Sequence, residues 1–357
     1  MEAKQMIINQ LPVRTWNHLK MNEAVVKDAA FVKKGTVEVF PTAGLQVEST
    51  SSVDFSTIPT GAGKDMDLAA TAADPEGITI YSKKEQAEED FVRLVYTYEE
   101  DGNAMNTLRL ETADDATLTV YVEMKAKEGI TGKGALSIKA KLGKESCLRL
   151  ITVQKSEEGF ELFNDIGGAT EEKAKFEVCQ LILGNGDQYN GCDVELHGEA
   201  SETEINVGYA KAGKSRLDMN YIARHYGPLT ISNITASGSL RDQSFKLFRG
   251  TLDFVRGAKE ASGAEAEDVF LIDDGVINQT IPLILCGEEN VAGAHGATIG
   301  KPDDDTVFYL KSRGIPEAEA IELLAQAKLQ AVVHKIPHKA LRREYEILTG
   351  GFVDEEE

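Results

Sequence analysis

The sequence predicts a mainly β protein, with a long tract of strands between an N-terminal segment of mixed character and a C-terminal helical segment. Three observations lead to this prediction. Apolar and polar residues alternate through most of the middle of the chain. Turn-forming residues interrupt this tract at short intervals. Near the C-terminus, apolar residues recur at helical spacing instead. These changes place boundaries at residues 1–90, 91–305 and 306–357.

The N-terminal segment is predicted to hold one short amphipathic helix and a linker. The helix is expected in "LPVRTWNHLKMNEAVV" after Pro12, because Trp16, Leu19, Ala24 and Val26 suggest one apolar face. The stretch "STSSVDFSTIPTGAGKDMD" is rich in Ser, Thr, Gly and Pro and predicts a loop or mobile linker.

The middle tract consists of short strands with one buried face. In "ATLTVYVEMKAK" every second residue from Leu118 to Ala126 is apolar, and "ALSIKAKL", "FEVCQLIL", "CDVELHG" and "TEINVGY" repeat the pattern. The expected turns are Gly143-Lys144, Gly167-Gly168, Gly184-Asn185-Gly186, Asn190-Gly191, Gly213-Lys214 and Ser237-Gly238. About 200 residues of such strands fit a sandwich, a barrel or a β-solenoid. We favour the solenoid, since there is no Cys…Trp…Cys core signature and no strong hairpin pattern, although no clean repeat is visible.

The C-terminal segment is predicted to form two helices. Pro316 stands at the start of the first, and apolar residues follow at helical spacing up to Val332. Pro337 ends that helix and opens a second, "HKALRREYEIL", which stops at Gly350-Gly351. The acidic tail "DEEE" is expected to be solvated.

Composition narrows the classes of partner. The net charge is -21, with 59 acidic and 38 basic residues, which argues against nucleic acid and anionic membranes. No signal peptide is visible in the first residues, and no apolar run approaches the roughly 20 residues of a membrane span. The four cysteines are scattered, so reduced thiols and a cytoplasmic location are expected.

Most motifs of enzymes are absent. "GAGKD" and "GATIGKP" are too short for a phosphate-binding loop, and Pro302 stands where Ser or Thr is needed. Cys179, Cys192 and His197 match no zinc spacing, and Cys179 is expected to be a buried thiol. Pro337 separates His334 from His338 and argues against a metal pair there. With no nucleophile elbow or catalytic triad either, we predict that the chain is not an enzyme.

One histidine stands out in "NVAGAHGATIG". A His in a loop of small residues is more often structural, but Gly293, Ala294, Gly296 and Ala297 leave His295 unshielded. A neutral imidazole that is sterically accessible is a competent metal ligand. The next acidic turn, 303–305, is interpreted as hydrated rather than catalytic.

These residues carry a family resemblance. "AHGATIGKPDDDTVFYLKSRGI" followed by "PEAEAIELL" resembles the C-terminal signature of the SufB/SufD family of iron–sulfur cluster assembly proteins. "FRGTLDFVRGA", "FLID", "TIPLIL" and the N-terminal "LPVRTWNHLKMNE" support it. Ala294-His295-Gly296 replaces the Glu-His-Glu of SufB members, so the chain looks SufD-like. The resemblance implies a right-handed parallel β-helix with helical N-terminal and C-terminal parts.

The resemblance also implies functional residues and partners. It points to His295 as the residue that meets a SufB-like scaffold subunit, where a transient iron–sulfur cluster or iron would lie, with no cofactor bound tightly by this chain alone. Some SufD members have a cysteine where this chain has Gly293. The supporting motif residues are Gly293, Gly296, Thr298, Tyr309 and Arg313. A SufC-like ABC ATPase would contact the helix after Arg313, with Pro316, Ile321 and Leu324 as candidates.

The implied function is a scaffold in de novo cluster assembly and iron acquisition. The sequence leaves open whether the chain forms a homodimer in isolation, and neither nucleic acid nor a membrane is an expected partner. Two rival interpretations are a carbohydrate-active β-helix enzyme and a structural homo-oligomeric solenoid.

Overall fold

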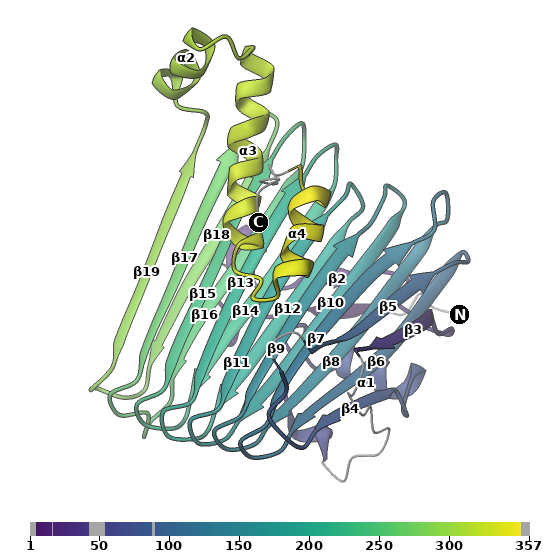
Figure 1. Ribbon diagram of the computed structural model, residues 1–357, viewed down its shortest axis with the longest axis vertical. Helices are drawn as coiled ribbons and strands as arrows, with labels where there is room; N and C mark the ends of the chain where they lie inside the picture. The colour runs from purple at the N-terminus through teal and green to yellow at the C-terminus, as the bar shows by residue number, and fades with distance from the viewer. Residues whose placement is uncertain (1–4, 16, 43–53, 88–89, 351–357) are drawn as a thin grey trace.

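The fold is a parallel β-solenoid made of two long sheets that face each other (Figure 1). The computed structural model describes residues 5–15, 17–42, 54–87 and 90–350. Successive strands alternate between the two sheets, and each strand from β4 to β17 pairs in parallel with the strand two positions later in the chain. The predicted mainly β solenoid is therefore confirmed.

The first sheet has eight strands and the second has nine. The strands of the first sheet are β4 (Ile78–Ser82), β6 (Gly102–Thr112), β8 (Gly132–Leu142), β10 (Phe160–Thr170), β12 (Gln188–Leu196), β14 (Arg216–His225), β16 (Phe245–Phe254) and β18 (Ile277–Cys286). Those of the second sheet are β3 (Thr36–Pro41), which is antiparallel, β5 (Val92–Tyr98), β7 (Thr117–Ala126), β9 (Cys147–Lys155), β11 (Lys175–Leu183), β13 (Glu202–Lys211), β15 (Ile231–Leu240), β17 (Ser262–Leu271) and β19 (Ala292–Gly300). Strands β3 and β4 lie in the segment 1–90 and already belong to the two sheets.

The turns that join the first sheet to the second repeat one backbone device. A residue with positive φ occurs in each of six turns: Asp115, Glu145, Lys173, Ala200, Leu229 and Glu260. The N–H of each donates to a carbonyl of the next turn, as Asp115 does to Lys144 at 2.8 Å. These residues recur every 27 to 31 residues. Because the spacing varies and the residue types differ, no clean period shows in the sequence.

Columns of apolar side chains fill the interior between the sheets. In-register pairing stacks one residue per strand, so that each column runs along the solenoid axis. One column of the second sheet consists of Val92, Val120, Leu150, Val178, Ile205 and Ile234, all almost fully buried. Each such side chain contributes roughly 1.5–3 kcal/mol when it leaves water. The repeated burial holds the two sheets together.

Helices cover the outer face of the second sheet. Helix α3 (Glu317–Val333) begins directly after its N-cap Pro316, and α4 (Lys339–Leu348) follows Pro337, as predicted. They pack on the sheet through a cluster that includes Leu329, Val332, Leu341 and Tyr345. The ring of Tyr345 stacks on Tyr121 of β7 at 5.3 Å. A further helix, α2 (Asp304–Ser312), projects beyond the end of β19 (Figure 1).

The N-terminal segment covers the first sheet and differs from its prediction. Instead of an amphipathic helix, Asn17–Leu19 form a 3-10 turn (η1) and Ala24–Val26 form strand β2, which pairs with β1 (Met6–Ile8). Ala24 and Val26 are buried while Val25 is exposed, a period of two that fits a strand better than a helix. Trp16 lies outside the described residues.

Part of the expected linker is also ordered. Phe55–Thr57 form a 3-10 turn (η2), and helix α1 (Lys64–Ala73) starts within the stretch predicted to be a loop. Met66, Ala69 and Ala70 of this helix are buried. The apolar positions of this helix begin only after "GAGKD". Because the glycines of that stretch are typical of a loop, the sequence did not indicate where the helix begins.

Three of the predicted turns lie inside strands. Gly167-Gly168, Asn190-Gly191 and Ser237-Gly238 belong to β10, β12 and β15. Their glycines allow close approach rather than reversal of the chain. A Cβ on Gly167 or Gly191 would collide with the backbone of residues 59–62, and one on Gly238 would collide with Tyr209. The glycines therefore mark where other parts of the chain pack against these strands.

Candidate functional site

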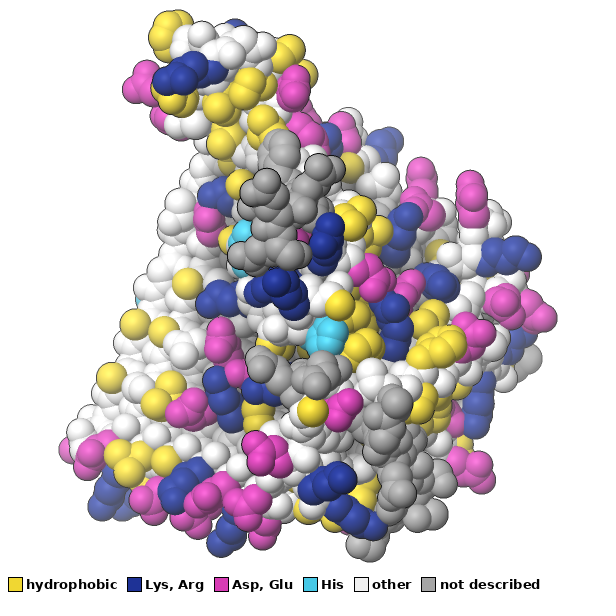
Figure 2. Space-filling view, in the orientation of Figure 1, with side chains coloured by type: hydrophobic (Ala, Val, Ile, Leu, Met, Phe, Trp, Pro, Cys, Tyr) yellow, Lys and Arg dark blue, Asp and Glu magenta, His cyan; other side chains and the backbone are white. Residues whose placement is uncertain are grey.

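The solenoid has an open end at β18 and β19, which we call the terminal rung. Each of these strands is the last in its sheet and is paired along one edge only. Large apolar side chains are exposed there, with Ile277 at 52% and Ile299 at 46%. Figure 2 shows few charged side chains along the edge that β19 forms. The terminal rung thus presents free backbone edges and an apolar end face together.

His295 lies in the middle of β19, on the terminal rung. Its imidazole is exposed and makes no hydrogen bond or ion pair with any described residue. Gly293, Gly296 and Thr298 lie on the same strand. A Cβ on Gly296 would meet nothing within 4 Å, whereas one on Gly293 would touch Ile284 and Phe254 at 3.1 Å. His295 is therefore presented in an open setting, as predicted from its small neighbours.

Buried charged residues lie one strand below His295. In the register of β17 and β19, His295 pairs with Glu265 and Ala297 pairs with Glu267. Both glutamates are buried in the interior, at 4% and 3% exposure. Lys246 of β16 forms an ion pair with Glu267, and Thr280 of β18 donates to the second oxygen of Glu267 at 2.7 Å. An ionic cluster thus occupies the last buried layer before the terminal rung.

The electrostatics of the two glutamates differ. Burial, and secondarily the charge of Glu267, raise the pKa of Glu265 to about 8. Burial also lowers the pKa of Lys246, although Glu267 opposes this effect. Lys246 compensates one of the two carboxylates, and its hydrogen bonds go to Glu267 and Thr280. Glu265 has no such partner.

Sequence reasoning missed these residues, although a signal was present. In "SGAEAEDVFL" the glutamates occupy alternate positions of a strand, in phase with the buried Val269. Acidic residues on the apolar phase of a strand are unusual, because a buried charge is costly. The pattern was obscured by the adjacent Asp268, which points outward and pairs with Lys328.

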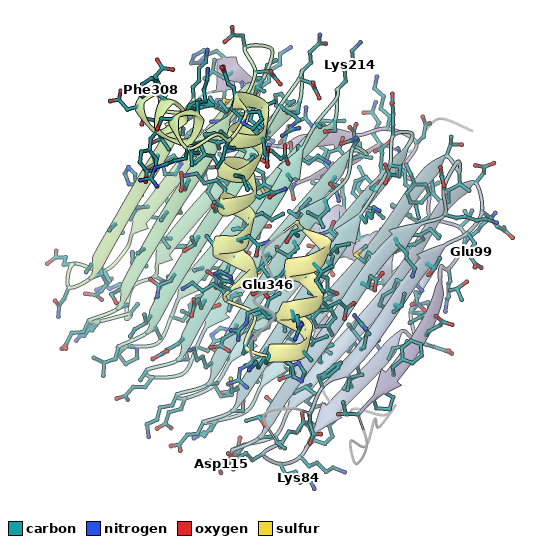
Figure 3. The ribbon with its side chains drawn as sticks, turned by 45° about the horizontal axis from the view of Figure 1, so that its top comes forward. Lys84, Glu99, Asp115, Lys214, Phe308 and Glu346 are labelled. Carbon is teal, nitrogen blue, oxygen red and sulfur yellow. The ribbon has the colours of Figure 1, made fainter. Side chains whose placement is uncertain are left out.

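The other predicted residues form a second group at the far end of β19. Tyr309 lies in α2 and Arg313 is the C-cap of this helix, and the Arg313 guanidinium lies over the Tyr309 ring at 5.0 Å. Phe308, on the same helix, is 73% exposed and stands apart from the body of the solenoid (Figure 3). Pro316, at the start of α3, is exposed. Ile321 and Leu324, the two residues of α3 predicted to contact the ATPase, are half-buried.

The remaining motif residues have structural roles. Cys179 is buried beneath α3, and burial raises the pKa of its thiol to about 12, as expected for an inert cysteine. His338 caps α4 by accepting from the Leu341 N–H at 3.3 Å. Asp303 caps α2 by accepting from the Thr306 N–H at 2.9 Å. Within the described ranges, no three His, Cys, Asp or Glu side chains are grouped so that they could hold a metal ion.

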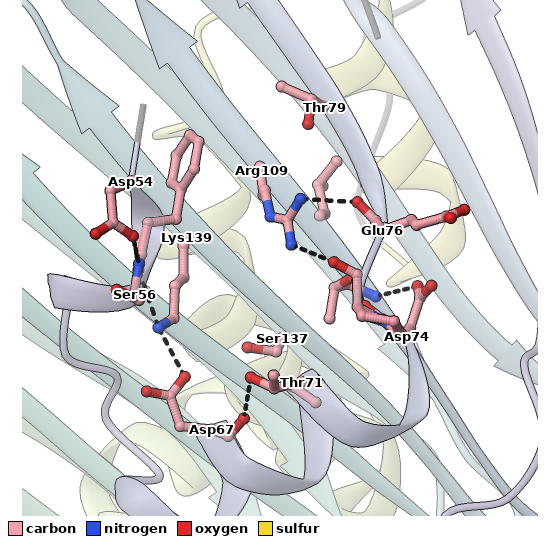
Figure 4. Close-up of a pocket in the computed structure, with 15 residues that line it drawn as sticks. Asp54, Ser56, Asp67, Thr71, Asp74, Glu76, Thr79, Arg109, Ser137 and Lys139 are labelled. Carbon is pink, nitrogen blue, oxygen red and sulfur yellow. Dashed lines mark hydrogen bonds and ion pairs between the residues drawn. The ribbon is translucent and has the colours of Figure 1, made fainter. Parts of the chain in front are cut away.

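One polar cavity of about 500 Å³ lies between α1, η2 and the first sheet (Figure 4). Its Lys139 pairs with Asp67 at 2.7 Å. Its Arg109 donates to the carbonyls of Pro75 and Glu76 at 2.6 and 2.8 Å. Because the two cations bond to the N-terminal segment, they serve to hold that segment on the sheet. No described helix is long and apolar enough to cross a membrane.

Comparison with known proteins identifies the solenoid. Residues 95–328 match the model of the "SUF system FeS cluster assembly, SufBD core domain" family, which is about two thirds of the chain. The chain belongs to the SufBD family. The match covers the strands from β6 to β19, both glutamates, His295 and most of α3.

Relatives of the SufBD chain include three bacterial proteins. It is 23% identical to the iron–sulfur cluster assembly protein SufD of Bacillus subtilis, over 75% of this chain and 62% of that protein. It is 27% identical to a SufBD family protein of Staphylococcus saprophyticus, over 42% of this chain and 32% of the relative. A SufBD family protein of Mycobacterium tuberculosis is 28% identical over 40% of this chain and 17% of its own length. The chain thus spans less than two thirds of each relative.

Proposed function

We propose that this chain is a SufD-like scaffold component of a Suf system for iron–sulfur cluster assembly. One observation carries the proposal: the SufBD core ends in an open terminal rung on which His295 is exposed. A solitary chain would leave two sheet edges and exposed isoleucines in water at the same place. Such an end is suited to meet another protein.

The partner at the terminal rung is proposed to be a SufB-like subunit. A second solenoid of the same family would continue both sheets by pairing its own strands with β18 and β19. Ile277 and Ile299 would then be buried. The near absence of charge along β19 supports an apolar contact (Figure 2).

A SufC-like ABC ATPase is proposed to bind α2 and the start of α3. Helix α2 has no buried residue among those described and exposes Phe308 and Tyr309. Pro316 adds exposed apolar surface, while half-buried Ile321 and Leu324 connect the contact to the sheet through α3. Aromatic side chains exposed on a projecting helix are typical anchors of protein interfaces.

The two contacts together suggest a mechanism for the assembly. Closure of two ATPase subunits on ATP would pull on α2 and α3 of each scaffold and turn the two solenoids relative to each other. The terminal rung would open and expose His295 to iron and sulfur, which are the cargo. A preference of a few kcal/mol of nucleotide-bound ATPase for one arrangement suffices. In this proposal the chain acts in the cytoplasm as a scaffold and catalyses no reaction itself.

The test is co-purification of the chain with a SufB-like subunit and a SufC-like ATPase. The wild-type chain should retain both. Ile299→Asp should remove the SufB-like subunit but retain the ATPase, and Phe308→Ser should do the reverse. As a matched control, Val25→Asp changes an exposed apolar residue of β2 and should retain both. Loss of neither partner in the two test variants would refute the assigned surfaces, and no capture by wild type would refute the proposal.

Two rival functions are distinguished by the same experiment. A homo-oligomeric solenoid would pair its terminal rung with a second copy and would capture neither Suf protein. A carbohydrate-active enzyme needs carboxylates that are free to act in a groove. In the polar cavity of Figure 4, Asp67 pairs with Lys139 and Asp54 accepts from the Ser56 N–H. Asp74 pairs with Lys34. This leaves Glu76 as the one carboxylate of the described lining without an ion pair or a capping role, whereas glycoside hydrolysis needs two. Membership of the SufBD family favours the Suf function over both.

A further inference from the structure

Glu265 breaks an apolar column of the interior. From β5 to β15, the six residues stacked in its column are Val, Leu or Ile, from Val92 to Ile234. The next two positions are Glu265 on β17 and His295 on β19. Polar groups thus enter this column only in its last two layers. If packing alone determined the residue at this position, an aliphatic side chain would be expected there instead of a carboxylate.

The Glu265 carboxylate has no partner inside the protein. It makes no hydrogen bond or ion pair with any described residue, and its Oε2 is fully buried. The nearby Lys246 bonds to Glu267 and Thr280 instead. A buried carboxyl oxygen without a hydrogen-bond partner is costly. The charge of Lys246 acts on Glu265, but its hydrogen bonds go elsewhere, so the carboxyl group is available to a cation that displaces its proton.

The opposite sheet makes room for this carboxylate. Gly250 faces Glu265 across the interior, and a Cβ on Gly250 would collide with the Glu265 carboxyl group. The preceding residues of the Gly250 column are larger, namely Tyr221 and Cys192. The absence of a side chain at Gly250 therefore gives the Glu265 carboxyl group its room in this layer, beneath the terminal rung.

His295 supplies a second ligand at a suitable separation. Register neighbours on adjacent parallel strands are about 4.8 Å apart, and their side chains point to the same face. A cation about 2.1 Å from each ligand atom can be shared by two such side chains. An imidazole next to a carboxylate suits a divalent first-row transition metal. A lysine or arginine from another protein fits less well. It would pair with the Glu265 carboxylate, but a neutral imidazole at His295 adds no negative charge for it.

We propose that Glu265 and His295 together bind one divalent first-row transition-metal cation, such as Fe²⁺, at the terminal rung. Water or a facing protein completes the coordination, since the described residues provide no third ligand at this position. The proposal deepens the proposed function by naming Glu265 as a residue that receives iron. Metal binding itself requires only this chain.

The test uses the full chain alone, freed of any affinity tag, with Co²⁺ as a coloured probe and Fe²⁺ under anaerobic conditions. Wild type should bind one equivalent with a change in the visible Co²⁺ spectrum. Glu265→Gln and His295→Ala should each weaken binding by at least about tenfold, since even residues that only support metal ligands contribute that much. Glu260→Gln, an exposed glutamate in the turn before β17, is the matched control and should bind as wild type does.

Several outcomes would overturn the proposal. Wild type that binds no Co²⁺ or Fe²⁺ would do so, as would Glu265→Gln with unchanged affinity and spectrum. Circular dichroism and thermal melting of each variant check that the fold is intact. Gly250→Ala gives an independent arm, since displacement of the carboxylate should weaken binding while Glu265 remains present. Partner capture is measured separately, so loss of metal binding with intact capture would refute this inference and leave the proposed function standing.

Discussion

Arg249 and Asp218 form an ion pair that is completely buried between the first sheet and the N-terminal segment. Arg249 Nη1 lies 2.7 Å from Asp218 Oδ1, and neither side chain is exposed. Arg249 Nε donates to the Met21 carbonyl at 2.7 Å, and Asn9 Nδ2 donates to Asp218 Oδ1 at 2.9 Å. The pair thus links β14 and β16 to two separate points of the N-terminal segment.

Arg249→Met is expected to destabilise the protein by roughly 1.5–3 kcal/mol, the usual contribution of hydrogen bonds to charged groups. It removes one of the two cations that pair with Asp218, while Arg216 stays 2.8 Å from the other carboxylate oxygen. Urea unfolding measures the loss, and limited proteolysis should show earlier cleavage within residues 5–42. Arg241→Met is the matched control. Its pair with Glu322 is exposed, so it should cost less than about 1 kcal/mol. Equal losses in both variants would contradict the anchoring role of Arg249.

Asp165 should make stability depend on pH. It accepts from the Ala62 N–H at 2.8 Å, and burial raises its pKa to about 7. In the unfolded chain the carboxyl would ionise near pH 4, so between pH 4 and 7 the unfolded state binds fewer protons than the folded state. The free energy of unfolding should therefore fall with rising pH across this window, by roughly 4 kcal/mol at most at 1.36 kcal/mol per pKa unit.

Asp165→Asn should remove this contribution to the pH dependence. Asn keeps an oxygen that can accept from Ala62 but does not ionise. The variant should be more stable than wild type at pH 8 and close to it at pH 4, as judged by urea midpoints at both values. Identical pH profiles of the two proteins would show that Asp165 does not ionise on unfolding in this window.

Gly191→Ala is expected to cost about 1–3 kcal/mol, the usual effect of overpacking. A Cβ there would collide with the backbone at Gly61 and Ala62, which cannot move independently of the N-terminal segment. Gly296→Ala provides the comparison, since open space surrounds that position in the chain alone. Thermal melting should separate the two, and a Gly296→Ala variant that loses as much stability would contradict this reasoning.

His295→Ala should leave the proposed complex intact but lower the yield of assembled cluster. The imidazole makes no hydrogen bond or ion pair with any described residue, so its removal should leave the fold and the capture of both partners unchanged. Cluster content is measured by absorbance and iron analysis after co-expression. His197→Ala, at an exposed histidine just after β12, is the control. Undiminished cluster assembly in a strain that lacks other copies of the protein would remove His295 from the mechanism.

Local pattern decided much of the architecture. Period-two alternation predicted the strands of the middle tract, and Pro316 and Pro337 predicted where α3 and α4 begin. His295 also stood out, because its small neighbours are adjacent in sequence. These features depend on contacts between residues close in the chain, so the sequence alone is enough to predict them.

Tertiary structure decided what depends on stacking. The segment near Leu19, predicted as a helix, forms a turn and a strand instead, because Ala24 and Val26 pair with β1. The glycines at 167, 191 and 238 were misjudged as turns because the groups that approach them come from distant or neighbouring rungs. The position of Glu265 next to His295 became apparent only from the register of β17 and β19. Sequence alone thus determined a chain of strands with two terminal helices and an unshielded imidazole. Only the winding of those strands placed a buried, unpaired carboxylate directly beneath it, since residues 30 positions apart become neighbours there.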